Sequence, residues 1–373
     1  MMSAHARTPA GKPRARAIGL VVGGRPGPLN AITDVPGVAV GYTTLIEGQG
    51  PLVPGRGPVR TGVTAILPRA VEDLQTPVFA GYHSFNGNGE LTGVHYIAEA
   101  GKISLPVTIT NTNSCGVARD ATIRWATTRF AGAFDEDFAL PVAAETYDGF
   151  LNDINGFHVT DAHVFAAIES ASAGPVEEGS VGGGTGMKCF GFKAGSGTAS
   201  RIVPYAGRDY TLGAFVQANF GAREDLTVLG QRIGAAFDAW QMRRGTPDRS
   251  LSSIIAVIAT DAPFLPHQLR RLAQRATVGV ARMGGIGRHG SGDIFLAFST
   301  ANREISGRST PALLGSAWVP DEDIDPFFAA AAEGVEEAIL NAMIANADME
   351  GRDGNFVPAI PHDRLREVLG LSA

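Results

Sequence analysis

The chain has 373 residues, of which 44% are hydrophobic and 18% are charged, a composition typical of a globular protein with a sizeable core. Its net charge of −6, without a basic cluster on one helix face, excludes an electrostatic surface for nucleic acid. No run reaches the roughly 20 apolar residues of a membrane span, and Cys115 and Cys189 are too few for a disulfide framework, so we expect a cytoplasmic protein.

The predicted elements begin behind a short tail. Residues 1–16 are expected to form a flexible N-terminal tail. Beyond it, short β-branched runs alternate with Gly and Pro turns, which predicts strands at 37–41, 63–67 and 105–110. A first helix is expected from Asp120 toward Arg129.

Apolar residues at the helical period predict two longer helices. One runs from Glu224 to about Met242, and the other from Phe327 to Met349. The second is rich in alanine on its packing face, and its paired acids Glu336 and Glu337 are expected to face water.

The segment from 251 to 300 is the most informative. Ser253–Thr260 and Asp293–Thr300 are nearly continuous apolar runs, the pattern of strands buried on both faces. Pro266–Met283 between them has helical spacing. The polar stretch 243–252 resembles an exposed loop that leads into the first strand. This alternation predicts an α/β fold with sheets between helix layers.

Common catalytic motifs are missing from the sequence. There is no G-x-S-x-G, no Walker A and no H-E-x-x-H pattern. Gly285–Gly290 matches G-x-G-x-x-G, but it joins a helix to a strand, which is the wrong context for a dinucleotide. His289, within this stretch, is expected to stabilise a turn. We therefore expect no metal and no organic cofactor.

A serine at the start of a buried strand suggests a different chemistry. If the bond before Ser253 were cut, its own α-amino group, with a pKa near ~7.7–8.0, could accept the proton of its hydroxyl. Ser291 and Asp293 begin the second strand, 38 residues later (291 − 253), so a strand–helix–strand return would place them beside Ser253. From composition alone, strand-edge turn residues remain the favoured interpretation of all three.

Longer blocks resemble a known family. Ser253–His267 and His289–Thr300 are similar to the β-chain signatures of the DmpA family, which comprises the L-aminopeptidase/D-amino-acid esterases and β-peptidyl aminopeptidases of serine peptidase family S58. The resemblance extends over nearly the whole chain, through blocks in the family's order at 34–38, 110–113, 145–149, 216–221 and 361–365. It implies an Ntn-hydrolase-like α/β/β/α sandwich, which the ornithine acetyltransferases resemble.

The resemblance also implies self-cleavage. The family's precursors cut themselves before the serine that opens this strand, which here is the Ser252–Ser253 bond. The products would be an α chain, 17–252 behind its tail, and a β chain, 253–373, that share one catalytic domain. A homo-oligomer of such αβ units, a tetramer in the family, is expected.

Site residues can be carried over where motifs match. Ser253 matches the nucleophile, and Ser291 and Asp293 match the motif that supports it and its amine. Tyr147 matches the tyrosine whose hydroxyl helps to form the oxyanion hole, and Asn219 matches the asparagine that supplies the other donor, a task that suits neutral groups. Glu145 matches an acid that holds the substrate's ammonium group. The implied substrates are small peptides, amides or esters with a free amino group.

Ser252 departs from the glycine or asparagine that the family has before the cut. Glycine gives backbone freedom for the strained acyl shift, so a serine is expected to slow or shift processing. Leu251–Ser252 is an alternative cleavage site, and Ser250 is a weaker nucleophile candidate. Two other functions stay open: an uncleaved, inactive binding relative, and an acyl transferase akin to the ornithine acetyltransferases, although these use threonine.

Overall fold

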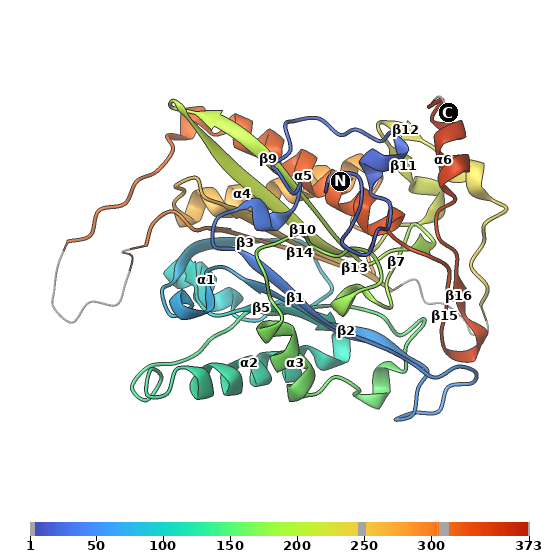
Figure 1. Cartoon of the computed structure of the whole chain (residues 1–373), viewed down its shortest axis with the longest axis horizontal. Coiled ribbons are helices and arrows are strands. Elements are labelled where there is room, and N and C mark those ends of the chain that lie inside the picture. Colours follow the sequence, from blue (N-terminus) through green and yellow to red (C-terminus); the bar gives the residue numbers. More distant parts are fainter. Residues whose placement is uncertain (1–3, 245–250, 304, 306–312, 372–373) are drawn as a thin grey trace.

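The computed structural model describes residues 4–244, 251–303, 305 and 313–371. Two sheets lie face to face at its centre (Figure 1). The larger has the strand order β4 (Lys102–Ile103), β3 (Val78–Gly87), β14 (Ser291–Ser299), β13 (Ser252–Thr260), β10 (Arg208–Asn219) and β9 (Ser196–Tyr205). The smaller has the order β1 (Ala39–Glu47), β2 (Val59–Leu67), β5 (Val107–Asn111) and β6 (Ala143–Thr146).

Helices cover the outer faces of both sheets (Figure 1). The larger sheet packs against α4 (Pro266–Arg282) and α5 (Asp325–Ile344), and the smaller against α2 (Cys115–Arg129) and α3 (Asp161–Glu169). Short helices α1 (Val94–Ala100) and α6 (His362–Val368) lie at the periphery, together with the hairpins β7 (Lys188–Cys189) with β8 (Phe192–Lys193), β11 (Thr227–Val228) with β12 (Gln231–Arg232), and β15 (Met349–Glu350) with β16 (Phe356–Val357).

Three apolar layers fill the spaces between these four layers of elements. On β13, Ile254 packs toward the helices α4 and α5, whereas Ile255 packs toward the other sheet. Trp125 and Val164 belong to the third core, beneath the smaller sheet. This alternation is what a strand buried on both faces requires, and it confirms the predicted α/β/β/α sandwich.

The predicted strand–helix–strand return is present. β13 and β14 are parallel neighbours joined by α4, and their register places Ser252 opposite Ser291 and Ser253 opposite Gly292. On its other side, β13 pairs antiparallel with β10, which places Asn219 opposite Ser253. The start of β13 is therefore held between two strands.

Some local expectations were wrong. The predicted helix at 224–242 is replaced by two 3₁₀ turns, Arg223–Asp225 and Gly234–Phe237, around the β11–β12 hairpin. Leu229 and Gly230 have φ values of 48° and 79°, which an α-helix does not allow. The first predicted helix begins at Cys115 rather than Asp120, and the last spans Asp325–Ile344 rather than 327–349.

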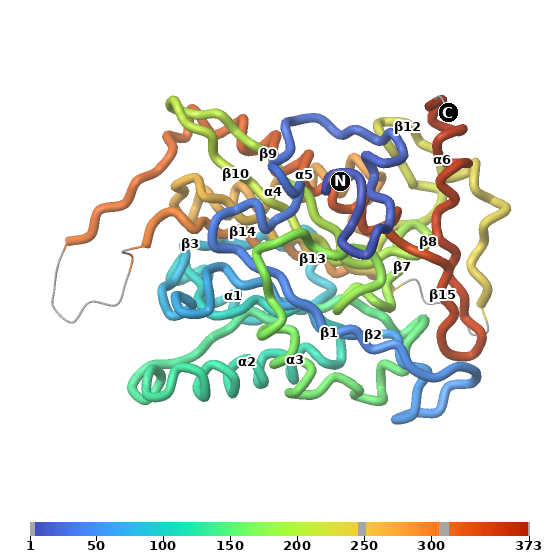
Figure 2. The backbone as a smooth tube through the Cα atoms, in the orientation of Figure 1, coloured from blue at the N-terminus to red at the C-terminus, as the bar shows by residue number. Residues whose placement is uncertain are grey.

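Glu336 and Glu337 are buried instead of facing water. Glu337 accepts from Arg16 and from Arg201, with a closest distance of 2.6 Å to Arg16. The described part of the expected flexible tail is likewise packed: Arg14 is 3% exposed and bonds Glu178 at 2.7 Å. Figure 2 shows this N-terminal segment lying over α5. Within the described ranges, none of the helices has the length and apolar character to cross a membrane.

Candidate active site

Ser253 lies where the two sheets meet. Its side chain is 3% exposed, and alternation along β13 places it on the same face as Ile255, toward the smaller sheet. The main-chain N–H of Tyr147, just after β6, donates to the Ser253 hydroxyl oxygen at 3.2 Å. The structure thus brings Tyr147 to Ser253, and the observed bond comes from its main chain.

Asn219 is held in one orientation. Its Oδ1 accepts from the main-chain N–H of Lys188 at 3.0 Å, and its Nδ2 donates to the carbonyl oxygen of Tyr147 at 2.9 Å. These partners identify which end of the amide carries the nitrogen, and they use one of its two N–H bonds. The side chain is 1% exposed. Asn219 is therefore a preorganised neutral donor beside Ser253.

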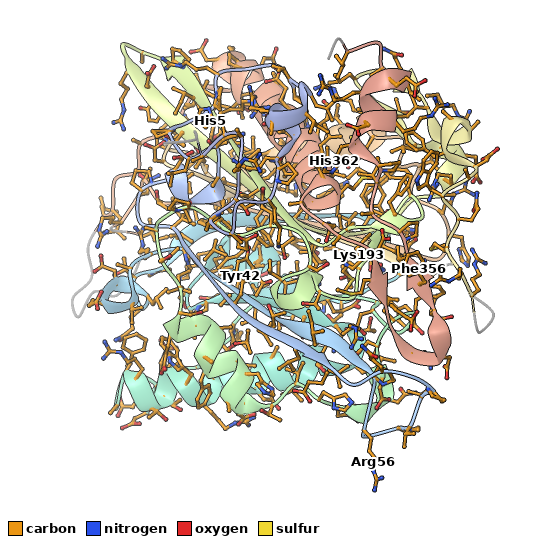
Figure 3. The ribbon with its side chains drawn as sticks, turned by 45° about the vertical axis from the view of Figure 1, so that its right-hand side comes forward. His5, Tyr42, Arg56, Lys193, Phe356 and His362 are labelled. Atoms are coloured by element: carbon orange, nitrogen blue, oxygen red, sulfur yellow. The ribbon has the colours of Figure 1, made fainter. Side chains whose placement is uncertain are left out.

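The hairpin that carries Lys188 is itself anchored by a buried lysine. The ammonium group of Lys193, which is labelled in Figure 3, donates to the carbonyl oxygens of Met187 at 2.9 Å and Ala194 at 2.6 Å. Its complete burial lowers its pKa well below the ordinary value. Sequence reasoning missed Lys193, because a lone lysine in a short hairpin carries no local signal of burial.

Glu145, at the end of β6, is 3% exposed. One carboxylate oxygen accepts from the main-chain N–H of Glu90 at 3.0 Å, and the other accepts from the hydroxyl of Thr112. Burial raises its pKa, and these two hydrogen bonds oppose the rise. Thr112 had not been singled out, although it lies within the block 110–113 that carried the family resemblance.

Ser291 and Asp293 form a pair of their own. The Ser291 hydroxyl donates to Asp293 at 2.6 Å, and burial raises the pKa of Asp293 to about 6. Alternation along β14 places both on the helix-facing side with Phe295, opposite the side chain of Ser253. Asp293 accepts from the main-chain N–H of Ile254. The pair therefore adjoins the backbone around Ser253 rather than its hydroxyl.

Asp148 is a further buried acid in this region. It follows Tyr147, is fully buried and accepts from the Asn152 side chain at 3.0 Å. Burial raises its pKa to about 7, and the charge of Glu145 adds to the rise. Its Oδ2 has no hydrogen-bond partner among the described residues. A charged Asp148 is consequently poorly stabilised by the fold.

A cavity of about 380 Å³ lies beside the Ser252–Ser253 bond. Ser252 and Asn219 line it, together with the cations Lys188, Arg223, Arg244 and Arg288 and one acid, Glu224. The alternative nucleophile Ser250 lies outside the described residues. The described part of the chain holds no group of three metal-ligating side chains.

This geometry suits acyl transfer. A buried hydroxyl oxygen lies next to a main-chain donor and a fixed amide donor, while a carboxylate near the same strand ends offers a cation site. Preorganised neutral donors stabilise the oxyanion that forms when a hydroxyl attacks a carbonyl.

Comparison with known proteins agrees with this arrangement. The family model described as peptidase family S58 matches residues 30–357. The beta-peptidyl aminopeptidase BapA of Sphingosinicella microcystinivorans is 48% identical over 369 residues, covering 96% of this chain and 92% of the relative.

Two solved aminopeptidase structures are also similar to this chain over nearly its whole length. The L-aminopeptidase D-Ala-esterase/amidase of Ochrobactrum anthropi, described as a variant among the Ntn hydrolase fold, has a TM-score of 0.89 and 51% identity, covering 96% of this chain and 98% of that one. A Burkholderia sp. beta-aminopeptidase has a TM-score of 0.87 and 48% identity, with the same coverage.

Proposed function

The chain belongs to peptidase family S58, and from this premise we propose that it is a self-processing aminopeptidase whose nucleophile is Ser253. The observation that carries the proposal is the position of the Ser253 hydroxyl, which accepts the Tyr147 N–H at the start of a buried strand. Its substrates are short peptides, amides or esters with a free amino group, the class to which the relatives' names refer.

Self-cleavage begins with attack of the Ser253 oxygen on the carbonyl carbon of Ser252. The peptide C–N bond breaks as the proton moves from the hydroxyl to the departing nitrogen, which leaves an ester and a free α-amino group. Water then hydrolyses this ester. Hydrolysis leaves a carboxylate at Ser252, which ends the α chain (17–252, preceded by residues 1–16). It leaves an amine at Ser253, which begins the β chain (253–373).

The freed amine then acts as the general base in each turnover. It accepts the hydroxyl proton as Ser253 attacks the substrate carbonyl, and it returns that proton to the leaving amine. Water then hydrolyses the acyl ester on Ser253, which releases the acid and restores the hydroxyl. Asn219 and Tyr147 stabilise the oxyanion, and Glu145 pairs with the substrate ammonium. Ser291 and Asp293 keep the new amine of Ser253 in place from the opposite face of the sheet.

Mass spectrometry of the purified protein tests the proposal. Two fragments are expected, with the smaller beginning at Ser253, together with hydrolysis of a short amino-terminal amide. The Ser253→Ala variant should remain whole and inactive, whereas Ser252→Ala should still be cut at the same bond. A fragment that begins at Ser252, or cleavage of Ser253→Ala, would contradict the assignment. An intact, inactive wild-type chain would favour a binding role.

The processed αβ units are further proposed to assemble into a homo-oligomer, as the family resemblance implies. Sedimentation of the processed enzyme measures this directly: a mass several times that of one chain is expected, and the mass of a single αβ unit would contradict it.

A further inference from the structure

The peptide group between Met187 and Lys188 joins two side chains by hydrogen bonds. Its N–H, which belongs to Lys188, donates to Oδ1 of Asn219 at 3.0 Å. Its carbonyl oxygen, on Met187, accepts from the side-chain nitrogen of Lys193 at 2.9 Å. Because a peptide group is planar and rigid, a shift at one of these bonds is passed on to the other. Lys193 and Asn219 are therefore the two ends of one hydrogen-bonded chain.

The orientation of the Asn219 amide depends on this chain. Only Oδ1 can accept from the Lys188 N–H, so this bond prevents the amide from turning over. Nδ2 donates to the carbonyl oxygen of Tyr147 at 2.9 Å, and its remaining N–H is available to an oxyanion at Ser253, the residue opposite Asn219 in the sheet. A turned amide would present its oxygen to that negative charge instead.

Lys193 is a costly way to hold a hairpin. Its side chain is completely buried, and none of the carboxylates in the described part of the chain pairs with it. The main chain already closes the hairpin, because the N–H of Ala194 donates to the same Met187 oxygen at 3.1 Å. Lys193 adds a second donor to that oxygen, and either protonation state of its nitrogen has the two N–H bonds that its two carbonyl partners need. Closing the hairpin alone therefore does not require this lysine.

The second donor also changes the strength of the chain. A hydrogen bond to the Met187 oxygen polarises the peptide group and makes the Lys188 N–H a stronger donor. That N–H in turn draws electron density from the Asn219 amide, which strengthens the donor groups on Nδ2. Hydrogen bonds in series reinforce one another in this way where the surroundings are poorly polarisable. The side chains of Lys193, Met187 and Asn219 are all buried, so water does not weaken the effect.

We propose that Lys193 is a positioning residue for the oxyanion hole. Through the 187–188 peptide group it holds Asn219 in its donating orientation and strengthens the N–H that faces the reaction. The proposal rests on the proposed function, because it requires Asn219 to stabilise an oxyanion at Ser253. Lys193 itself does not touch the substrate, so its removal should lower kcat and leave KM nearly unchanged.

The Lys193→Met variant tests this role, because methionine keeps a similar length but has no donor. Rates are expressed per cleaved chain, counted by mass spectrometry, so that slower processing is not mistaken for lower activity. We expect kcat to fall about tenfold, the weight of one buried hydrogen bond, with KM within about twofold of the wild type. An unchanged kcat, or a change in KM alone, would overturn the proposal. The shorter Lys193→Gln takes its place if Lys193→Met does not fold.

A double-mutant cycle with Asn219→Ala separates this role from a general one. If both side chains act through one donor, adding Lys193→Met to Asn219→Ala should lower kcat by less than about twofold further. A further loss of about tenfold would show that Lys193 acts elsewhere and would overturn the proposal.

Arg223 provides the matched control, because it is a second cation that anchors the same hairpin. It donates to the carbonyl oxygens of Phe190 and Gly191, both at 2.7 Å, and its other printed-chain partners, Phe237 and Trp240, likewise lie outside the 187–188 peptide group. The effect of Arg223→Met on kcat should be the same with and without Asn219→Ala. Equal dependence of both variants on Asn219 would assign the effect to the hairpin as a whole and overturn the proposal.

Failure of the proposed function is visible separately. In that case the wild-type chain stays uncleaved and inactive, or Asn219→Ala alone retains the wild-type kcat, before any Lys193 variant is compared.

Discussion

The main-chain N–H of Tyr147 and the hydroxyl oxygen of Ser253 are 3.2 Å apart, although 106 residues separate them in sequence. One follows the last strand of the smaller sheet, and the other lies near the start of a central strand of the larger sheet. The hydrogen bond therefore joins the two sheets. Packing of the sandwich core, rather than a local loop, positions the nucleophile.

Asn219→Ala should lower kcat by about 10²–10³-fold with a much smaller change in KM, because an oxyanion donor acts mainly in the transition state. Steady-state kinetics of the processed enzyme measures both constants. Asn219→Asp should lower kcat at least as much as Asn219→Ala, since aspartate keeps the acceptor for the Lys188 N–H but loses the donor to the Tyr147 carbonyl oxygen. A rise in KM alone would instead assign Asn219 to substrate binding.

Thr112→Val should shift the acid limb of the kcat/KM profile to higher pH. The Thr112 hydroxyl favours the ionised form of Glu145, so its removal raises a pKa that burial has already raised. At neutral pH we expect a loss of kcat/KM of about tenfold or less, given the weight of one charge-assisted hydrogen bond. Thr112→Ser keeps the hydroxyl and should retain the wild-type pH profile. A shift in both variants would show that the packing of the side chain, rather than its hydroxyl, is responsible.

Asp148→Asn should flatten the pH dependence of the free energy of unfolding. With a folded pKa of about 7 against an ordinary 3.8, the folded chain holds a proton that the unfolded chain releases. The wild type should therefore lose stability as pH rises from about 4 to about 7, by an amount on the order of a few kcal/mol. Urea unfolding in the uncleaved Ser253→Ala background measures this, and an unchanged slope in Asp148→Asn would contradict it.

Ser252→Gly should shorten the half-time of self-cleavage several-fold, because glycine relieves the backbone strain of the acyl shift. The appearance of the two fragments after rapid purification gives the rate. Ser252→Ala lacks the hydroxyl but not the Cβ, so it should stay near the wild-type rate. If alanine accelerated cleavage as much as glycine, the hydroxyl rather than the backbone would be the obstacle.

Elements with strong, local signals were predictable from the sequence. The strands at 252–260 and 291–299 are apolar on both faces, and the helix between them has a clear apolar stripe. The 224–242 segment has helical spacing too, but Gly230 and Gly234 interrupt it. An added Cβ at Gly234 would lie 1.8 Å from the Arg223 carbonyl oxygen, a close approach that only the folded chain reveals.

Interactions between residues far apart in the sequence could not be predicted from the sequence. Glu337 was expected to face water as an acid on the polar side of a predicted helix, yet Arg16 and Arg201 pair with it from distant segments. The site residues could be named from motifs, but not the main-chain donor of Tyr147, since any residue type offers an N–H. Thr112 and Lys193 became evident only through their contacts.

The strand order of the larger sheet has a consequence for the cut molecule. β13 and β14 lie side by side in the middle, with β3 and β10 on their flanks. A cut before Ser253 would assign the two inner strands to one fragment and the flanking ones to the other. The two fragments would be interleaved in the larger sheet, and neither would contain all of its strands. Separately made halves would each expose unpaired strand edges and aggregate, so synthesis as one precursor secures their pairing before the break.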